Sequence, residues 1–538
     1  MGNKFTSQAS TTNLNNPNSN SSYNHSQSLP SLPKSLNEQT ISYSTANVFE
    51  EEPINEDAQN IQSKQMAVID LDSMLSCAMS SKNAYIKLSA TESQKLPVLF
   101  NIKTKDQDNK NGDDYRPPID LFCVIDHSGS MGGNKINLVR ETLKYLVSIL
   151  TPNDRLCIIL FDDKAETLTG LRRVSEANIP IFNENISKIR SRGGTNMILG
   201  LNRALEIMQS RKFRNKVTSL FMLSDGLDNI GNVDKKFKES LEKMNIQDVF
   251  TVNTFGFGDD HDPEIMRNLA VIKDGNFYYI EKLDIVDECF VGALAGLLSV
   301  IGEKLTIKVS ANNKPPFSDL RISKVFGTQW KHNEEDKSYC FNMNQLWLGI
   351  SKELMMEINV PPIKKKVDDL DRNVILLKAE LEVNSITEKK TVKRELELAF
   401  TLYNEDEEIP GEVIKKVNPE VMKNYLRVQG VEVIENARML SDQGKYNEGK
   451  KLLSDNLKEF EAEEFKSDPK LQVLANDMRK IEKMCEPGQY EMKGKKFMMG
   501  QERFHCEQRC NNVSSKDYED LYCNNQERAM KANLRSKK

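Results

Sequence analysis

DLFCVIDHSGSMGG, at residues 120–133, joins two kinds of sequence in one short stretch. Residues 120–125 are almost all apolar, which predicts a strand that is covered on both faces. Asp126, Ser128 and Ser130 follow directly, and the glycines among and after them allow a tight turn. The stretch therefore predicts a buried strand that ends in a loop of oxygen-bearing side chains.

Residues 119–301 repeat this arrangement of apolar runs separated by helical patterns. The apolar runs are IDLFCVI, LCIILF, VTSLFML, DVFTVNTF and NFYYIE. Between the first two runs, Ile136, Val139 and Leu143 recur at the spacing of one helix face. Buried strands that alternate with amphipathic helices predict an α/β domain with a mostly parallel sheet covered on both faces. AETLTGLRRV follows LCIILF after a short turn, so we expect it to be an antiparallel edge strand.

Two further loops carry oxygen-bearing side chains at the expected edge of the sheet. RGGTN precedes the helical run ILGLNRAL and supplies Thr195, and LSDG follows VTSLFM and supplies Asp225. Ligands of an open parallel sheet bind beyond the carboxyl ends of its strands. Two carboxylates and three hydroxyls offer the hard oxygen chemistry that Mg²⁺ prefers, with Mn²⁺ and Ca²⁺ as alternatives. Because only two protein charges meet the divalent ion, a further anionic ligand is expected.

The three motifs DxSxS, GGTN and SDG, in that order, resemble the metal-ion-dependent adhesion site of von Willebrand factor type A (VWA) domains. The resemblance covers residues 119–301 and implies a doubly wound, Rossmann-like α/β fold. It implies that Ser128 and Ser130 bind Mg²⁺ directly and that Thr195 binds directly or through water. Asp126 and Asp225 are expected to act largely through water. An Asp or Glu side chain of a protein partner completes the coordination in that family, so the resemblance implies binding and not turnover.

The α/β domain is followed by QLWLGISKELMMEINVP within a β-rich region and then by a helical segment. This order is similar to that of intracellular VWA proteins such as the plant ubiquitin ligases that combine a RING with this domain. It is also similar to that of proteins like the inter-alpha-trypsin-inhibitor heavy chains. No CxxC…CxxC cluster precedes the α/β domain, and the first cysteine is Cys77. Ligase activity is therefore not expected. A metal-independent scaffold or a ubiquitin-pathway adaptor stays open as the alternative function.

The regions around the α/β domain predict further parts. Residues 66–103 and 303–401 contain short β-rich runs, which predict the antiparallel strands of a β-sandwich. Strands on both sides of 119–301 favour insertion of this domain into the sandwich, and the alternative is that 66–103 only flanks it. Residues 418–485 predict a helical hairpin or small bundle. Residues 486–538 are polar and weakly patterned and predict a weakly ordered tail.

The amino-terminal region is rich in polar residues. Residues 1–63 contain abundant Asn, Ser, Gln and Pro and too little apolar material to offset the entropy of ordering, so they predict a disordered tail. The first residues, MGNKFT, match the N-myristoylation pattern with Gly2 as the acceptor, although many unmodified proteins also begin with Met-Gly. One myristoyl chain anchors a protein only marginally, so membrane association through Gly2 is expected to be reversible.

The composition of the 538 residues narrows the class of protein. A formal net charge of -5 argues against general binding to nucleic acid. No apolar run reaches the roughly 20 residues that span a bilayer, and the amino terminus lacks the apolar core of a secretion signal. Nine cysteines at irregular spacing indicate mostly reduced thiols. We therefore expect a cytoplasmic protein of roughly two to four domains.

Two enzyme motifs match only in part. VIDLDSML, with Asp70 and Asp72, superficially resembles the nucleophile loop of haloacid-dehalogenase-like phosphatases. Asp259 and Asp260 in GDDHD imitate their acidic metal motif, but no βα unit follows VIDLDSML directly. GSMGGNK approaches a phosphate-binding loop but carries Asn134 where the second glycine is required. A metal-dependent phosphohydrolase is therefore the least favoured function, and we do not expect an enzyme.

The carboxyl-terminal region contains four residues with metal-binding side chains. They are His505, Cys506, Cys510 and Cys523. Their spacings match no standard zinc pattern, so unpaired cysteines are the favoured interpretation and a zinc site is the alternative.

Overall fold

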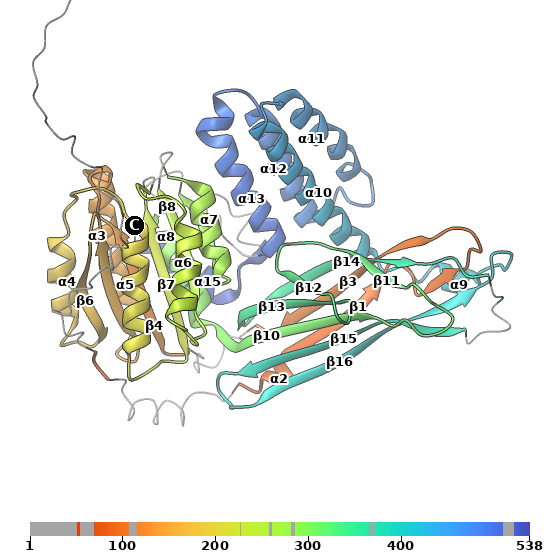
Figure 1. The fold of residues 1–538 in the computed structure, drawn as a ribbon, viewed down its shortest axis with the longest axis horizontal. Helices are drawn as coiled ribbons and strands as arrows, with labels where there is room; N and C mark the ends of the chain where they lie inside the picture. The colour runs from red at the N-terminus through yellow and green to blue at the C-terminus, as the bar shows by residue number, and fades with distance from the viewer. Residues whose placement is uncertain are drawn as a thin grey trace, which may run out of the picture. The chain divides into compact units, whose positions relative to one another are not determined.

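The computed structural model describes residues 51–53, 69–106, 116–225, 228–257, 261–280, 286–364, 366, 372–508 and 521–537. These residues form an α/β domain, two β-sheets and a set of carboxyl-terminal helices (Figure 1). Gly2, and with it the predicted acylation, lies outside the described residues.

A six-stranded sheet forms the centre of the α/β domain. Its strands are β4 (Ile119–Asp126), β5 (Arg155–Phe161), β6 (Ala165–Arg173), β7 (Val217–Ser224), β8 (Thr251–Phe257) and β9 (Phe277–Ile280). The order is β6-β5-β4-β7-β8-β9, and β4, β5, β7, β8 and β9 run parallel. Strand β6 pairs antiparallel with β5 at one edge, as predicted. Every residue of β4, β5, β7 and β8 is buried, which explains the apolar runs FCVI in β4, LCIILF in β5 and LFML in β7.

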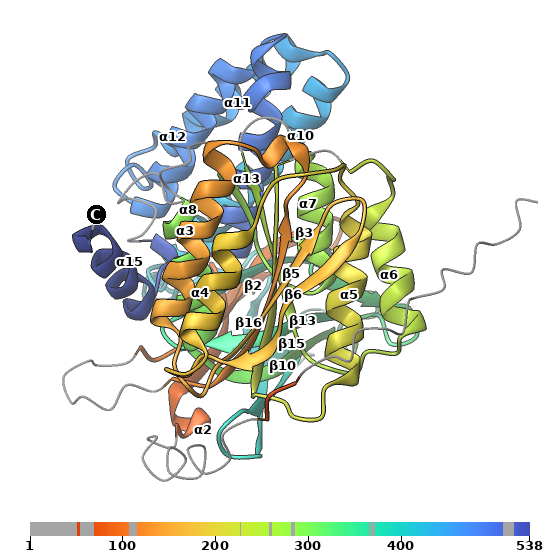
Figure 2. The ribbon, with the colours of Figure 1, turned by 90° about the vertical axis from the view of Figure 1, so that its left-hand side faces the viewer.

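Helices cover both faces of this sheet (Figure 2). One face packs against α3 (Asn134–Ile149), α4 (Ile179–Lys188) and α8 (Val286–Leu298). The other packs against α5 (Met197–Ser210), α6 (Val233–Lys243) and α7 (Pro263–Ile272). Strand β4 divides its side chains accordingly, with Leu121 and Cys123 on the first face and Phe122 and Val124 on the second. The predicted doubly wound α/β fold is confirmed.

Strands from both sides of the α/β domain share two further sheets. One has the order β1-β3-β14-β11 and the other β12-β13-β10-β15-β16-β2. Strand β3 precedes the α/β domain and pairs antiparallel with β14, and β2 pairs parallel with β16. The bounds are α2 (Leu71–Met74), β1 (Leu75–Ser81), β2 (Tyr85–Lys87), β3 (Gln94–Thr104), β10 (Val300–Ala311), β11 (Arg321–Val325), β12 (Trp330–Asn333), β13 (Ser338–Trp347), β14 (Ser351–Val360), β15 (Asn373–Ser385) and β16 (Thr391–Tyr403).

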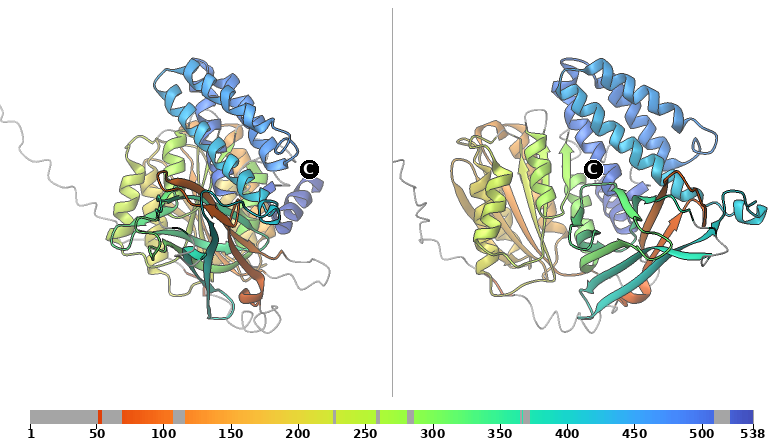
Figure 3. Two further views of the ribbon diagram at one scale, coloured as in Figure 1. Left: turned by 90° about the vertical axis from the view of Figure 1, so that its right-hand side faces the viewer. Right: turned by 45° about the vertical axis from the view of Figure 1, so that its right-hand side comes forward.

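Helices follow the second sheet. After the short α9 (Gly411–Ile414), α10 (Pro419–Asp442), α11 (Tyr446–Phe460) and α12 (Pro469–Met484) lie side by side (Figure 3). Asn418 and Asp468 accept hydrogen bonds from the first backbone N–H groups of α10 and α12, and a proline begins each of these two helices. Within the described part of the chain, no helix is both long and apolar enough to cross a membrane.

Residues 486–508 and 521–537 are described, and they differ from the prediction of a weakly ordered tail over residues 486–538. A π-helical turn, η4 (Tyr490–Gly494), leads into α13 (Lys495–Glu507), and α15 (Asn525–Lys537) lies near the end of the chain. Helix α13 buries polar side chains as well as apolar ones, including Glu502 and His505. Glu502 pairs with Arg438 at 2.7 Å, and His505 contacts Asp477 at 3.0 Å. A helix that buries paired polar residues lacks the apolar periodicity by which a sequence indicates a helix.

Candidate metal centre

Three loops meet at the carboxyl ends of β4 and β7. The first follows β4 and contains the short 3-10 helix η1 (Gly129–Met131), the second precedes α5, and the third follows β7. The N–H of Gly129 in the first loop donates to the carbonyl of Gly193 in the second, over 3.1 Å. The N–H of Asn229 in the third loop donates to the carbonyl of Thr195, over 3.0 Å. Backbone hydrogen bonds therefore join loops that are far apart in the sequence.

Four of the five predicted ligands form one hydrogen-bonded chain. The backbone N–H of Ser128 donates to Asp126 Oδ1 over 2.8 Å, and the hydroxyls of Ser128 and Ser130 lie 3.0 Å apart. The Ser130 hydroxyl donates to Asp225 Oδ1 over 2.8 Å. Thr195 lies in the adjoining loop, and its hydroxyl forms no hydrogen bond with the described residues. Tertiary structure thus brings Asp126, Ser128, Ser130 and Asp225 into contact and leaves the hydroxyl of Thr195 beside them uncommitted.

The exposure of these side chains shows where the centre opens. Asp126 and Asp225 are fully buried and Ser128 is 1% exposed, whereas Ser130 is exposed. Burial raises the pKa of Asp126, and hydrogen bonds from Ser128 and Ser224 oppose that rise. Ser224 is the last residue of β7 and Asp225 follows it directly, so the end of β7 holds one carboxylate and is followed by the other. The centre is a buried pair of carboxylates with a hydroxyl at its solvent side.

Lys135 is a member of the centre that the sequence motifs do not indicate. It lies in the first turn of α3, and its Nζ contacts Asp225 Oδ2. Asp225 therefore has one oxygen held by Ser130 and the other by an ammonium group. A cation that bound Asp225 would meet the positive charge of Lys135.

Further carboxylates hold the loop before α5. Asp163 accepts from the N–H of Gly194 over 2.9 Å, and Asp228 accepts from the N–H of Met197 over 2.9 Å at the first residue of α5. Burial alone would raise the pKa of Asp162, but hydrogen bonds from the Arg192 guanidinium and a backbone N–H lower it. Asp162 and Asp163 directly follow the apolar run of β5, and this position in the sequence could have indicated them.

His127 stands between two of the predicted ligands but contacts other groups. Its Nδ1 lies 3.0 Å from the carbonyl oxygen of Arg190, and its Nε2 lies 3.5 Å from Asp162 Oδ2. The buried imidazole therefore joins the first loop to the residue that follows β5 and to the segment after α4.

The residues of the alternative enzyme and zinc sites have structural contacts. Asp70 caps α2 by accepting from the N–H of Asp72 over 3.2 Å, and Asp72 pairs with Arg394 at 2.6 Å. Asp259, Asp260 and Cys510 lie outside the described residues. No group of three or more His, Cys, Asp or Glu in the described ranges has an arrangement that would hold a metal ion.

Comparison with known proteins agrees with this geometry. Residues 120–289 match the profile of the von Willebrand factor type A domain. This part of the chain is a VWA domain. VWA domains are generally interaction modules, and the predicted resemblance is confirmed. The match begins at the second residue of β4 and ends within α8, so it covers the sheet and the three loops of the candidate centre.

Relatives of the VWA domain occur in proteins of several kinds. An uncharacterized protein of Synechocystis sp. is 30% identical over 36% of this chain. The probable E3 ubiquitin-protein ligase WAVH2 of Arabidopsis thaliana is 25% identical over 46% of it, and the inter-alpha-trypsin inhibitor heavy chain H1 of Sus scrofa is 29% identical over 29%. The matches span only 43%, 33% and 18% of these three relatives. This chain therefore spans less than half of the length of each of these relatives.

Two solved structures share more of the fold. A von Willebrand factor type A protein from Catenulispora acidiphila has a TM-score of 0.58 at 15% identity and covers 82% of this chain and 98% of its own. The ArnB paralog VWA2 from Sulfolobus acidocaldarius has a TM-score of 0.52 at 17% identity and covers 82% and 100%. The likeness extends beyond the VWA domain, because that domain alone is much shorter than the part covered.

Proposed function

We propose that the VWA domain binds Mg²⁺ and that the bound ion holds an Asp or Glu side chain of a protein partner. Ser128, Ser130 and Thr195 would hold the ion through their hydroxyls, and Asp126 and Asp225 would act mainly through water. The observation that carries the proposal is the convergence of three loops that place hydroxyls and carboxylates together at the open end of the sheet. Hard oxygen donors of this kind suit Mg²⁺, and Mn²⁺ and Ca²⁺ would be the alternatives.

The charges around the centre support an acidic ligand. Asp126 and Asp225 contribute two negative charges and Lys135 one positive charge. A divalent cation added to this set leaves a net positive charge at the solvent side, where Ser130 is exposed. A carboxylate from a partner would neutralise that charge and take a remaining coordination position, since Mg²⁺ prefers octahedral coordination.

The proposal describes a binding protein and not an enzyme. Ubiquitin ligase activity belongs to the name of the Arabidopsis relative, of which the match spans 33%. We propose a cytoplasmic location, with reversible membrane association if Gly2 is acylated. A metal-independent scaffold is the second candidate, and one observation favours it: the ammonium group of Lys135 pairs with Asp225 and would oppose a second cation there.

Isothermal titration of Mg²⁺ into the full chain tests the metal site. We expect saturable binding that is at least tenfold weaker in Ser128→Ala and Thr195→Ala. Ser148→Ala is the matched control, because Ser148 is an exposed serine on α3 whose hydroxyl donates only to a local carbonyl. If the wild-type chain bound no Mg²⁺, or if the two site variants bound it as the control does, the metal site would be excluded.

Selection from a peptide display library in Mg²⁺ tests the acidic ligand. We expect the selected peptides to be released by EDTA and to share an Asp or Glu whose replacement by Asn or Gln abolishes binding. Peptides that remain bound in EDTA would favour the metal-independent scaffold. Metal-dependent peptides without an essential carboxylate would contradict the acidic ligand while leaving the metal site intact.

A further inference from the structure

The opposite edge of the VWA sheet, at the amino ends of β4 and β5, contains a buried network of charges. Asp120 begins β4 after Ile119, and its carboxylate accepts from Arg155 Nε over 2.8 Å and from Arg155 Nη2 over 2.6 Å. Arg211, just after α5, donates to the same carboxylate over 2.7 Å and to Asp248 over 3.0 Å. Asp120 and Arg155 are fully buried and Arg211 is 4% exposed. Buried charges such as these destabilise the fold unless each one has an oppositely charged or hydrogen-bonding partner.

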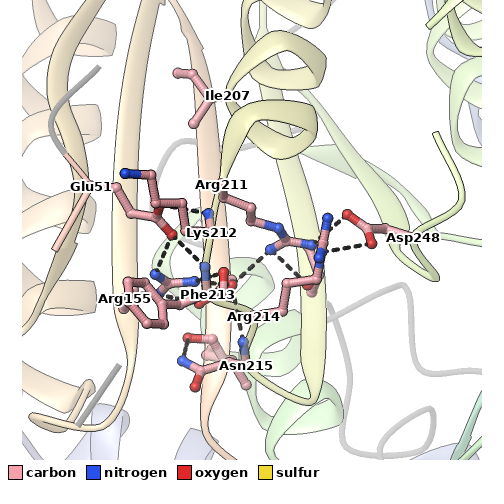
Figure 4. Close-up of polar contacts among 12 residues, drawn as sticks. Glu51, Arg155, Ile207, Arg211, Lys212, Phe213, Arg214, Asn215 and Asp248 are labelled. Carbon is pink, nitrogen blue, oxygen red and sulfur yellow. Dashed lines mark hydrogen bonds and ion pairs between the residues drawn. The ribbon is translucent and has the colours of Figure 1, made fainter. Parts of the chain in front are cut away.

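Glu51, from the stretch before the first β-sheet, completes the pairing of Arg155 (Figure 4). Its Oε1 accepts from Arg155 Nη1 over 2.9 Å and from the N–H of Phe213 over 3.1 Å. Its Oε2 accepts from the N–H of Lys212 over 2.7 Å. The side chain of Glu51 is only 8% exposed. One guanidinium and two backbone amides thus donate to both oxygens of one carboxylate.

Glu52 is held by a second set of donors at the edge strand β6. Its N–H donates to the carbonyl of Leu171 over 3.0 Å, as in the addition of a strand residue to a sheet edge. Its carboxylate accepts from the N–H and the Nε of Arg173, both over 3.0 Å, and from Asn178 Nδ2 over 2.6 Å. Its carbonyl oxygen accepts from Arg155 over 3.1 Å. The dipeptide is therefore recognised through both side chains and through its backbone.

The charge balance of the network also requires these two carboxylates. The VWA domain itself contributes four guanidinium groups and two carboxylates to the ion pairs: Arg155, Arg173, Arg211 and Arg214, and Asp120 and Asp248. Glu51 and Glu52 raise the carboxylates to four against the four guanidinium groups. Without them, Arg155 would keep a buried Nη1 group without its anionic partner.

We propose that this edge of the VWA sheet is a second recognition site, for an extended acidic dipeptide, and that it works without metal. Glu51–Glu52 occupy it as an intramolecular ligand, at the edge of the sheet away from the candidate metal centre. The proposal does not rest on the metal site, because the parallel strands place the two sites at opposite ends. Residues 51–53 fall within the stretch that the sequence predicts as disordered, so the tertiary contacts account for their placement.

A peptide supplied in trans to the full chain tests the proposal. The probe is a labelled peptide of residues 46–56, ANVFEEEPINE, and its matched control has Gln in place of Glu51 and Glu52. Fluorescence anisotropy is measured in EDTA, so that metal binding makes no contribution. The receptors are the wild-type chain and Glu51→Gln/Glu52→Gln, whose own segment has lost both carboxylates.

We expect the double variant to bind the acidic peptide at least tenfold more tightly than the wild type, whose site is filled, and at least tenfold more tightly than it binds the control peptide. A folded double variant that binds neither peptide, or that binds the two equally, overturns the proposal. If the double variant does not fold, amide hydrogen exchange of Asn178→Ala in the otherwise wild-type chain decides. We then expect the Glu52 amide to exchange at least fivefold faster than in the wild type, and an unchanged rate overturns the proposal.

Discussion

Replacing Asp120 by asparagine tests how far the buried charges stabilise the VWA domain. The Asp120 carboxylate is fully buried and accepts from two nitrogens of Arg155 and one of Arg211, at 2.6 to 2.8 Å. An amide keeps the shape but loses the charge and turns an NH₂ group toward these donors. Removing one partner of a buried ion pair costs about 3–5 kcal/mol in the free energy of unfolding. For a domain of this size, that loss lowers the melting temperature by roughly 6–20 °C.

Thermal unfolding followed by far-UV circular dichroism measures this loss, and hydrogen exchange of the β4 and β5 amides assigns it to the VWA domain. The two tryptophans, Trp330 and Trp347, lie in β12 and β13, so their fluorescence follows a different part of the chain. Glu239→Gln is the control, because Glu239 is exposed on α6 and its substitution should change stability by no more than about 0.5 kcal/mol. If Asp120→Asn lowered the free energy of unfolding by less than about 1 kcal/mol, the reasoning would be refuted, because the buried ion pairs would then add little net stability.

Three other substitutions have expected outcomes. Gly275→Ala would place a Cβ 1.9 Å from the carbonyl oxygen of Val252, so denaturant unfolding should show a free energy of unfolding lower by at least about 1–3 kcal/mol. Wild-type stability of this variant would mean that the connection into β9 moves to relieve the clash. Lys135→Met removes the cation that contacts Asp225, so isothermal titration should show an Mg²⁺ affinity about tenfold higher, which is about 1.4 kcal/mol of binding free energy. Unchanged affinity would mean that the lysine does not oppose the metal. Burial lowers the pKa of His505 below its usual value of 6.5. As the pH drops below 6.5, the unfolded chain therefore takes up the proton before the folded chain does. The free energy of unfolding should then fall by up to about 1.4 kcal/mol per pH unit. His505→Gln should remove that part of the pH dependence of unfolding, and an identical dependence in the two proteins would contradict it.

The amino-acid sequence by itself determined the architecture of the VWA domain. Strands covered on both faces must be apolar throughout, so β4, β5 and β7 are visible as runs such as LFCVI. The candidate ligands were predictable for a related reason. Ser128, Ser130 and Asp225 each follow such a strand directly, and parallel strands end at one edge of their sheet, so position in the chain predicts position in space.

Only the tertiary structure decided which polar groups meet. Lys135 and Asp225 are 90 residues apart, and Glu51 and Arg155 are 104 apart, so no local pattern joins either pair. Helix α13 remained hidden for the same reason, because its buried Glu502 is paired by a residue of another helix. Apolar side chains show their burial through periodicity, since every buried position needs the same chemistry. A buried charge needs one particular partner, and the fold alone brings that partner to it.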